Sequence, residues 1–238
     1  MALPWKCLDR VATPEGVLEL RQRGPRDFLI TVGGRVLMNS TAQRSEIALG
    51  RIACRHLQHH PQPGVLLGGL GMGFTLKAVL DLLPAAGRVL VAELNPVVLA
   101  WCQGPLAGLT ASAVDDPRVT AEIADAAEVI RTAADRRTAF DAVILDLYTG
   151  PYAHCHGGDD PLYGSRAIAR AHAALTPGGV FAVWGENFEP VFESRLRAAG
   201  FKVTIARPGR GGFRHVVYRA RKAVSPNGPG QKQDDPPG

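Results

Sequence analysis

Short apolar runs alternate with longer amphipathic segments along most of this chain. Strand-like runs occupy residues 64–68, 88–93, 119–123, 142–146 and 179–184, and helix-like segments occupy 75–83, 96–103, 126–134 and 165–175. Strands that alternate with helices of this length predict a parallel sheet with helices on both faces. A helix at 189–199 and strands at 201–206 and 215–219 are predicted to complete it. We therefore expect a doubly wound, Rossmann-like α/β domain.

The pattern before residue 64 is different. Turn residues separate three strand-like runs at 16–20, 27–32 and 35–38, and the apolar residues of 45–57 have close to helical spacing. These runs predict a small N-terminal antiparallel β unit followed by a helix. The last residues are rich in Pro, Gly, Gln and Asp, a composition typical of disorder. The expected organisation is a β unit at 1–45, a Rossmann-like domain at 46–222 and a disordered tail at 223–238.

A glycine-rich turn follows the first strand-like run of the Rossmann-like domain. It contains Gly69, Gly71 and Gly73, and Glu93 ends the next strand-like run, twenty residues after the last of them. Glycines let the backbone approach a ligand closely, and an acid at the second strand end accepts hydrogen bonds from ribose hydroxyls. This spacing predicts a site for an adenosine-containing ligand.

Acidic residues also end two later strands. Asp125 follows the run at 119–123, and Asp146 ends the run at 142–146. Ligands of such sheets bind beyond the carboxyl ends of the strands, so these acids are expected to lie near the glycine turn. The turn reads G-x-G-x-G, the shorter glycine pattern found in S-adenosylmethionine-type sites, and Phe74 instead of a small residue follows the third glycine. A dinucleotide site remains the less favoured alternative, because a pyrophosphate requires a clear helix N-terminus.

Composition narrows the class of protein further. The chain has 238 residues and a net charge of +5, and it has no apolar run of the roughly 20 residues that a membrane helix needs. The first residues lack the apolar core of a signal peptide, so a cytoplasmic location is expected. Its four cysteines are far apart, which argues against a disulfide framework or a structural zinc site. The basic residues near the C-terminus have no aromatic binding motif beside them, so nucleic-acid binding is not expected.

Several strings in residues 65–184 resemble the spermidine synthase (polyamine aminopropyltransferase) family, within the class I S-adenosylmethionine-dependent methyltransferase fold. They are the glycine turn with its strand at 65–74, V-A-E-L-N-P at 91–96, D-P-R-V at 116–119, F-D-A-V-I-L-D at 140–146, P-L-Y at 161–163 and L-T-P-G-G-V at 175–180. The small N-terminal β unit also suits that family. The resemblance implies an α/β fold that binds S-adenosylmethionine or its decarboxylated form.

The resemblance also implies roles for individual residues. Gly69, Gly71 and Gly73 would line the thioether, Glu93 would hold the ribose and Asp125 the adenine. Asp146 stands where the family has its catalytic acid. An amine acceptor has a pKa of about 10, as for lysine, and must lose a proton before it attacks. A carboxylate at the strand end could take that proton; the alternative is that Asp146 only caps a turn.

Three departures from the family pattern concern the acceptor and the tail of the donor. Met72 stands where the family's glycine turn has an acid. That acid would attract the free ammonium of the decarboxylated donor, and methionine cannot. Thr149 replaces the second acid of the family's D-x-x-D-P motif. Arg44, Ser45 and Glu46 stand where a Tyr-Gln pair is expected, and Glu46 could neutralise Arg44. These departures leave the adenosine contacts in place.

Residues after Asp146 are candidates for the acceptor side. Tyr148 and Tyr152 could line an acceptor pocket or simply pack, and Asp159 and Asp160 could supply the missing negative charge or be solvated. His154, Cys155 and His156 are too closely spaced to bind one metal ion from a regular element, so no metal is predicted. Trp184 is expected to belong to the core.

Three functional hypotheses follow from these residues. The first is aminopropyl transfer from decarboxylated S-adenosylmethionine to a small-molecule amine, as in polyamine biosynthesis. The second is methyl transfer from S-adenosylmethionine on the same scaffold, which Met72 favours. The third is a non-catalytic protein that binds an adenosyl ligand. Dimers are common in the resembling family, so a homodimer is an open option.

Overall fold

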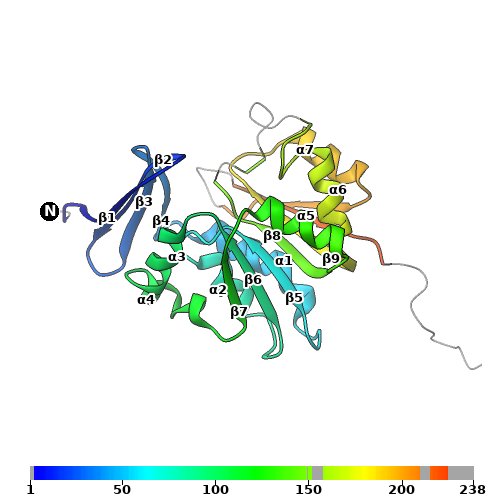
Figure 1. Cartoon of the computed structure of the whole chain (residues 1–238), viewed down its shortest axis with the longest axis horizontal. Helices are drawn as coiled ribbons and strands as arrows, with labels where there is room; N and C mark the ends of the chain where they lie inside the picture. Colours follow the sequence, from blue (N-terminus) through cyan, green and yellow to red (C-terminus); the bar gives the residue numbers. More distant parts are fainter. Residues whose placement is uncertain (1–2, 149, 152–157, 210–214, 225–238) are drawn as a thin grey trace, which may run out of the picture.

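A seven-stranded sheet organises the larger part of the molecule (Figure 1). The structure is a computed structural model that describes residues 3–148, 150–151, 158–209 and 215–224. The strand order is β10-β11-β9-β8-β5-β6-β7, and only β11 runs against the other strands. The strands are β5 (Gly64–Gly68), β6 (Arg88–Glu93), β7 (Val119–Ile123), β8 (Phe140–Leu145), β9 (Leu175–Gly185), β10 (Lys202–Ala206) and β11 (Val216–Arg221). The predicted parallel α/β sheet is confirmed.

Helices cover both faces of this sheet. One face packs against α1 (Arg44–Cys54), α2 (Phe74–Leu80) and α3 (Pro96–Gln103), and the other against α5 (Ala126–Arg136), α6 (Ser165–Ala173) and α7 (Pro190–Ala198). Successive residues of a strand point to opposite faces, so Val65 and Leu67 join one core while Leu66 joins the other. Central strands buried on both sides read as continuous apolar runs, as the sequence of β5 does.

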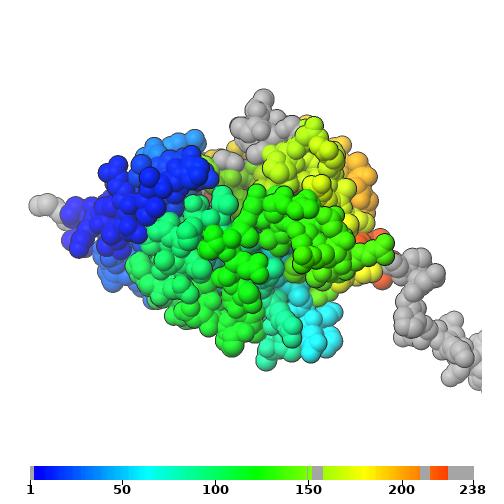
Figure 2. Space-filling view, viewed as in Figure 1, coloured from blue at the N-terminus to red at the C-terminus, as the bar shows by residue number. Residues whose placement is uncertain are grey.

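The N-terminal residues form a separate four-stranded antiparallel sheet. Its strands are β1 (Lys6–Thr13), β2 (Gly16–Arg23), β3 (Asp27–Val32) and β4 (Arg35–Asn39), in sequential order. Leu20 and Ile30 are buried in the same core as Met72 and Leu106 of the α/β unit. The sheet is therefore a packed part of the molecule, visible as the blue lobe at one end of the space-filling view (Figure 2).

Several predicted boundaries differ from the observed ones. Strand β1 was not predicted, because all eight of its residues are exposed or half-buried edge positions with no clear alternation. The predicted helix at 45–57 is α1 followed by a 3-10 turn at Arg55–Leu57. Helix α4 (Ala107–Thr110) and a 3-10 turn at Ala113–Asp115 were also not predicted. Asp146 lies just beyond β8 instead of inside it. Within the described ranges, no helix is long and apolar enough to cross a membrane.

Candidate active site

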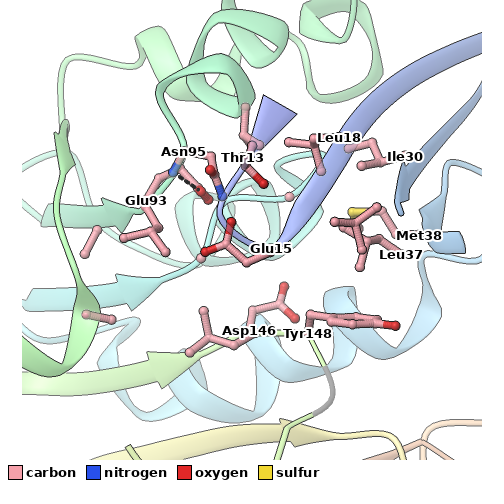
Figure 3. A pocket seen from close by; sticks show the side chains of 18 of the residues that line it. Thr13, Glu15, Leu18, Ile30, Leu37, Met38, Glu93, Asn95, Asp146 and Tyr148 are labelled. Carbon is pink, nitrogen blue, oxygen red and sulfur yellow. Dashed lines mark hydrogen bonds between the residues drawn. The ribbon is translucent and has the colours of Figure 1, made fainter. Parts of the chain in front are cut away.

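A cavity of about 510 Å³ lies between the N-terminal sheet and the carboxyl ends of β5, β6 and β8 (Figure 3). The sheet contributes Leu18, Ile30, Leu37 and Met38 to its wall, and the β1–β2 turn contributes Glu15. These residues face the strand ends that carry the predicted site residues. The topology therefore brings the predicted acids together at one edge of the sheet, as expected for parallel strands.

The glycine turn forms part of this wall. Gly69 and Gly71 line the cavity, and both have positive φ, +88° and +53°. A side chain at Gly69 would collide with the main-chain carbonyl of Asp146, and one at Gly71 would lie 2.9 Å from Met38 Sδ. Gly73 also has positive φ but precedes α2 and faces Thr110 instead of the cavity. The positive φ and the close packing thus require glycine at these positions. The main chain at Gly69 and Gly71 forms part of the cavity wall.

Glu93 is held rigidly at the end of β6. The N–H of Leu70 donates to its Oε2 and the N–H of Asn95 donates to its Oε1, each at 2.9 Å. The side chain is 7 % exposed, and burial raises the pKa of this carboxyl although the main-chain donors oppose the rise. The carboxylate is therefore fixed in one orientation on the cavity wall, where each oxygen has a further lone pair for a ribose hydroxyl.

Asp125 caps the N-terminus of α5 and also lines the cavity. Its Oδ1 accepts a hydrogen bond from the N–H of Ala127 at 2.8 Å, which is the usual interaction of an N-cap aspartate. Its side chain thus has a structural role in addition to the predicted contact with adenine. The two roles are compatible because the second carboxylate oxygen is not used by the cap.

Asp146 lies at the opposite part of the cavity, directly after β8. Its Oδ2 accepts a hydrogen bond from Thr75 Oγ1 at 2.6 Å, and its N–H donates to the carbonyl of Gly68 at 2.9 Å. Burial, together with the negative charge of Glu46, raises the pKa of Asp146 to about 7. A carboxyl group with this pKa can exchange a proton near neutral pH, as a general base requires.

Glu46 is a site residue that the sequence did not identify as such. It lies on α1, is 8 % exposed, and lines the cavity beside Asp146. The sequence predicted that Glu46 could neutralise the charge of Arg44. In the structure, Glu46 Oε2 accepts a hydrogen bond from Ser45 Oγ at 2.8 Å. The sequence signal was weak, because one acid in a helical segment is usually a solvated residue. Its burial depends on the packing of α1 against α2 and β9.

The charged residues that line the cavity are all acidic. They are Glu15, Glu46, Glu93, Asp125 and Asp146, and no Lys, Arg or His is found among the described lining residues. The whole chain has a net charge of +5, so this distribution is opposite to the overall balance. Glu15 comes from the β1–β2 turn, and its side chain points into the cavity (Figure 3). Such a cavity favours a ligand with several positive charges.

Two aromatic residues complete the wall. Tyr148 is 45 % exposed and lines the cavity, with the guanidinium of Arg35 5.9 Å from its ring. Trp184 was expected to be purely a core residue, but it also lines the cavity. Its Nε1 is buried and has no hydrogen-bond partner among the described residues. The wall near Asp146 therefore combines carboxylates with aromatic surface.

Asp159 and Asp160, two other predicted acceptor residues, do not line this cavity. Asp159 is exposed and pairs with Arg166 at 2.8 Å, while Asp160 accepts hydrogen bonds from the N–H groups of Leu162 and Tyr163. Neither aspartate is among the described lining residues. Tyr152, the segment from His154 to His156, and Thr149 lie outside the described residues, as does the tail from 225 onward. Within the described ranges, no cluster of three His, Cys, Asp or Glu side chains is arranged to hold a metal ion.

Met72, at the position of the missing turn acid, points away from the cavity. Its side chain is fully buried in the core beneath the glycine turn and is not a lining residue. A carboxylate in this position would be surrounded by apolar side chains and would be costly to ionise. Methionine therefore fits its surroundings, and any recognition of the donor's tail must come from other residues.

The fold is that of a class I methyltransferase-like protein, and its cavity is lined by a glycine turn and by acids at the strand ends. Sequence comparison is more specific: the model of the spermine/spermidine synthase domain matches residues 26–194. The chain belongs to the spermine/spermidine synthase domain family.

Individual relatives agree with this assignment. The chain is 32 % identical over 151 residues to the polyamine aminopropyltransferase of Mycobacterium tuberculosis, covering 59 % of this chain and 27 % of the relative. It is 34 % identical over 143 residues to polyamine aminopropyltransferase 1 of Hyperthermus butylicus, covering 57 % of this chain and 48 % of that protein. The chain therefore spans less than half the length of these relatives.

Solved structures support the fold. Spermidine synthase from Thermotoga maritima superposes with a TM-score of 0.70 at 20 % identity, covering 93 % of this chain and 74 % of the other. A probable spermidine synthase from Corynebacterium glutamicum gives a TM-score of 0.62 at 18 % identity, covering 91 % and 79 %. This coverage exceeds the length of the α/β unit, so at least part of the N-terminal sheet belongs to the shared fold.

Proposed function

We propose that this protein transfers an aminopropyl group from decarboxylated S-adenosylmethionine to an amine, as its relatives' names indicate for them. The observation that carries this proposal is the exclusively acidic set of charged residues on the described cavity wall. The decarboxylated donor has a sulfonium and an ammonium group and no carboxylate. The acceptor amine is also a cation before it reacts. An acidic cavity suits both substrates, and a small-molecule polyamine is the acceptor class it fits.

The glycine turn, Glu93 and Asp125 would hold the adenosyl part of the donor. Glu93 presents a fixed carboxylate to the ribose, and the main chain at Gly69 and Gly71 lies open to the thioether side. Glu15 would attract the ammonium of the aminopropyl tail in place of the acid that Met72 replaces. It is the charged group that the N-terminal sheet adds to the wall.

Asp146 would act as the general base. The acceptor ammonium gives one proton to its carboxylate, and the free amine then attacks the carbon beside the sulfonium. The new C–N bond forms as the C–S bond breaks, and the sulfur leaves as the neutral thioether 5′-methylthioadenosine. Glu46 adds a second carboxylate for the cationic acceptor, while Trp184 and Tyr148 offer aromatic faces to its charge.

Methyl transfer from S-adenosylmethionine is the second candidate, and Met72 is the observation that favours it. The ordinary donor has a carboxylate, and without an acid in the glycine turn one repulsive contact is absent. However, that carboxylate would enter a cavity whose described wall offers it no basic partner. The donor specificity is therefore what distinguishes the two functions.

Calorimetric titration with each donor tests the proposal. We expect the decarboxylated donor to bind at least about tenfold more tightly than S-adenosylmethionine, equivalent to about 1.4 kcal/mol. Glu15→Gln should reduce this ratio, and Glu122→Gln, an exposed residue on β7, is the matched control. Transfer is then measured as 5′-methylthioadenosine formed with a panel of diamines. Tighter binding of the ordinary donor would contradict the proposal, whereas binding without turnover would indicate the non-catalytic alternative.

The cellular location and the assembly state are separate expectations. The cytoplasmic location stays a prediction from the composition of the chain, and a homodimer stays an option that the family resemblance suggests. Cell fractionation tests the first, and size-exclusion chromatography with light scattering tests the second.

A further inference from the structure

A buried polar network lies behind the acidic end of the cavity, between α1 and the start of β11. Ser45 Oγ lies 2.8 Å from Glu46 Oε2 and 2.9 Å from His215 Nδ1. Ser45 and Glu46 are 5 % and 8 % exposed, and His215 is half-buried. The imidazole packs edge-on against Trp184, with ring centroids 4.9 Å apart. Because Glu46 and Trp184 line the cavity, the network connects the cavity wall to the imidazole.

The single proton of the Ser45 hydroxyl restricts how this network is bonded. Ser45 cannot donate to Glu46 and His215 at the same time. If Ser45 donates to the Glu46 carboxylate, Nδ1–H of His215 must donate to Ser45. If Glu46 is protonated, it can donate to Ser45, which then donates to Nδ1. The two arrangements differ by the transfer of one proton between Glu46 and His215.

We propose that Ser45 and His215 form a relay that carries the proton released by the acceptor amine out of the cavity. The proton that Asp146 takes from the amine passes to Glu46, the neighbouring carboxylate. The O–H bond of Glu46 then breaks as the Ser45 oxygen takes the proton, and Ser45 gives its own hydroxyl proton to Nδ1. Glu46 is again a carboxylate, and His215 is an imidazolium that gives its proton to solvent.

This relay rests on the proposed aminopropyl transfer, which releases one proton in each turnover. The reactants carry three positive charges, one on the acceptor ammonium and two on the donor. The products are a molecule with two ammonium groups, a neutral thioether and one free proton. That proton forms in a cavity that both substrates fill, so it needs a route that does not pass through them. Ser45 and His215 act through Glu46 and are positioning residues in this scheme, since neither is a lining residue.

Several elements that pack around this network contribute polar or ionisable side chains to it. Asp146 faces Glu46 from the end of β8, and His215 faces Ser45 from the start of β11. Helix α2 contributes Thr75, whose Oγ1 lies 2.6 Å from Asp146 Oδ2 and 3.1 Å from the main-chain oxygen of Glu46, so its one proton serves either acceptor, and β9 contributes Trp184. Neither of these two side chains ionises in the physiological range. The pH dependence of turnover should therefore change when the hydrogen bonds of this network are removed.

The test uses Ser45→Ala and His215→Gln in the full chain, with transfer rates measured from pH 6 to 9 at saturating donor. We expect kcat to fall by about tenfold near pH 7, because losing a positioned proton acceptor commonly costs one or more orders of magnitude. The loss should shrink at higher pH, where solvent base takes the proton, and KM for the amine should change by no more than about twofold. Imidazole in the buffer should restore much of the rate of His215→Gln.

Two variants serve as controls. Ser45→Thr keeps the hydroxyl and should keep the wild-type rate and pH profile. His172→Gln removes a histidine of α6 that packs on Phe201 away from the cavity, and it should change neither. Thermal unfolding identifies any variant that does not fold. If Ser45→Ala does not fold, the comparison of His215→Gln with wild type and with Ser45→Thr still tests the relay.

Each outcome is decisive. Wild-type profiles in Ser45→Ala and His215→Gln would overturn the relay while leaving aminopropyl transfer in place. A loss of the same size at every pH, without rescue by imidazole, would also overturn it and show that the network only supports the fold. Absence of transfer by the wild-type protein would remove the proposed function and the relay together, before any variant is compared.

Discussion

Asp146 illustrates how one residue's surroundings set both its chemistry and its energetic cost. The carboxyl group lies against the cavity wall with a hydrogen bond from Thr75 and the negative charge of Glu46 nearby. Burial and like charge disfavour its ionised form, and Thr75 compensates only in part. A general base with a pKa of about 7 therefore comes at the expense of stability at neutral and alkaline pH.

Asp146→Asn should stabilise the fold in a pH-dependent way. The pKa of this carboxyl is about 7 in the folded protein and 3.8 ordinarily, so the folded state holds a proton that the unfolded chain has lost. The wild-type penalty grows as pH rises from about 4 to 7 and is constant above 7. We expect the variant to be more stable at pH 8 by up to about 4 kcal/mol, and nearly equal to wild type at pH 4.

Denaturant unfolding at the two pH values measures this difference, with the surface variant Asp135→Asn as the control. Equal differences at both pH values would contradict the assigned cause. Transfer activity of Asp146→Asn should fall by about two to four orders of magnitude, while donor affinity is largely retained.

Glu93→Gln should weaken both the fold and the donor site. Each carboxylate oxygen accepts one main-chain N–H, and an amide would place its NH₂ group against one of these donors. Leaving that donor unsatisfied costs about 1–3 kcal/mol. We expect a lower unfolding midpoint and about tenfold weaker binding of 5′-methylthioadenosine. If Glu122→Gln, on the adjacent strand, gave the same losses, a specific role for Glu93 would be excluded.

At the scale of elements, the ends of β5, β6, β7 and β8 make the site. The sequence predicted β5, β6, β8 and the glycine turn well, because buried parallel strands leave continuous apolar runs that end in glycine or acid. It did not predict β1 or the contribution of Glu15, since an edge strand and a hairpin tip lack such a pattern. The roles of Glu46 and Met72 also escaped prediction. Their directions depend on how α1 and the N-terminal sheet pack, which no local pattern encodes.

Gly64→Ala and Gly69→Ala form a matched pair at the two ends of β5, because Gly64 begins the strand and Gly69 directly follows it. Gly69 has positive φ, and an added Cβ would collide with the carbonyl of Asp146, whereas a Cβ at Gly64 would meet nothing within 4 Å. We expect Gly69→Ala to lose more than about 3 kcal/mol of unfolding free energy, combining backbone strain with a clash against main chain. Gly64→Ala should stay within about 0.5 kcal/mol of wild type. Chemical denaturation of both variants checks this, and equal stabilities would show that the turn relaxes.

At the scale of the whole molecule, two parts enclose one ligand space. The α/β unit supplies the strand ends, the N-terminal sheet supplies the opposite wall, and the two parts share one of the molecule's two apolar cores. The charge is divided between interior and exterior, because an acidic cavity lies within a chain of net charge +5. A cationic substrate is therefore attracted locally although the molecule as a whole repels it weakly.

Ionic strength should show how much the acidic cavity contributes to the attraction of a cationic acceptor. Raising salt from about 0.05 M to about 0.5 M shortens the Debye length to a few Å and weakens attraction between charges that solvent reaches. We expect the KM of a diamine acceptor to rise several-fold, while the affinity for neutral 5′-methylthioadenosine hardly changes. Steady-state kinetics and calorimetry across the salt series provide the measurement. A salt-independent KM would show that the acidic wall does not attract the acceptor.

The main-chain bonds that join the strand ends have an evolutionary consequence. The N–H of Gly69 donates to the carbonyl of Ala92, and the N–H of Asp146 donates to the carbonyl of Gly68, each at 2.9 Å. The frame of the site is therefore built from peptide groups, which a change of side chain on the cavity wall leaves intact where no Cβ meets the main chain, unlike at Gly69. Side chains such as Glu15 and Glu46, which line the cavity, can be exchanged while these main-chain bonds are kept. New ligand preferences are thus accessible by single substitutions in this chain.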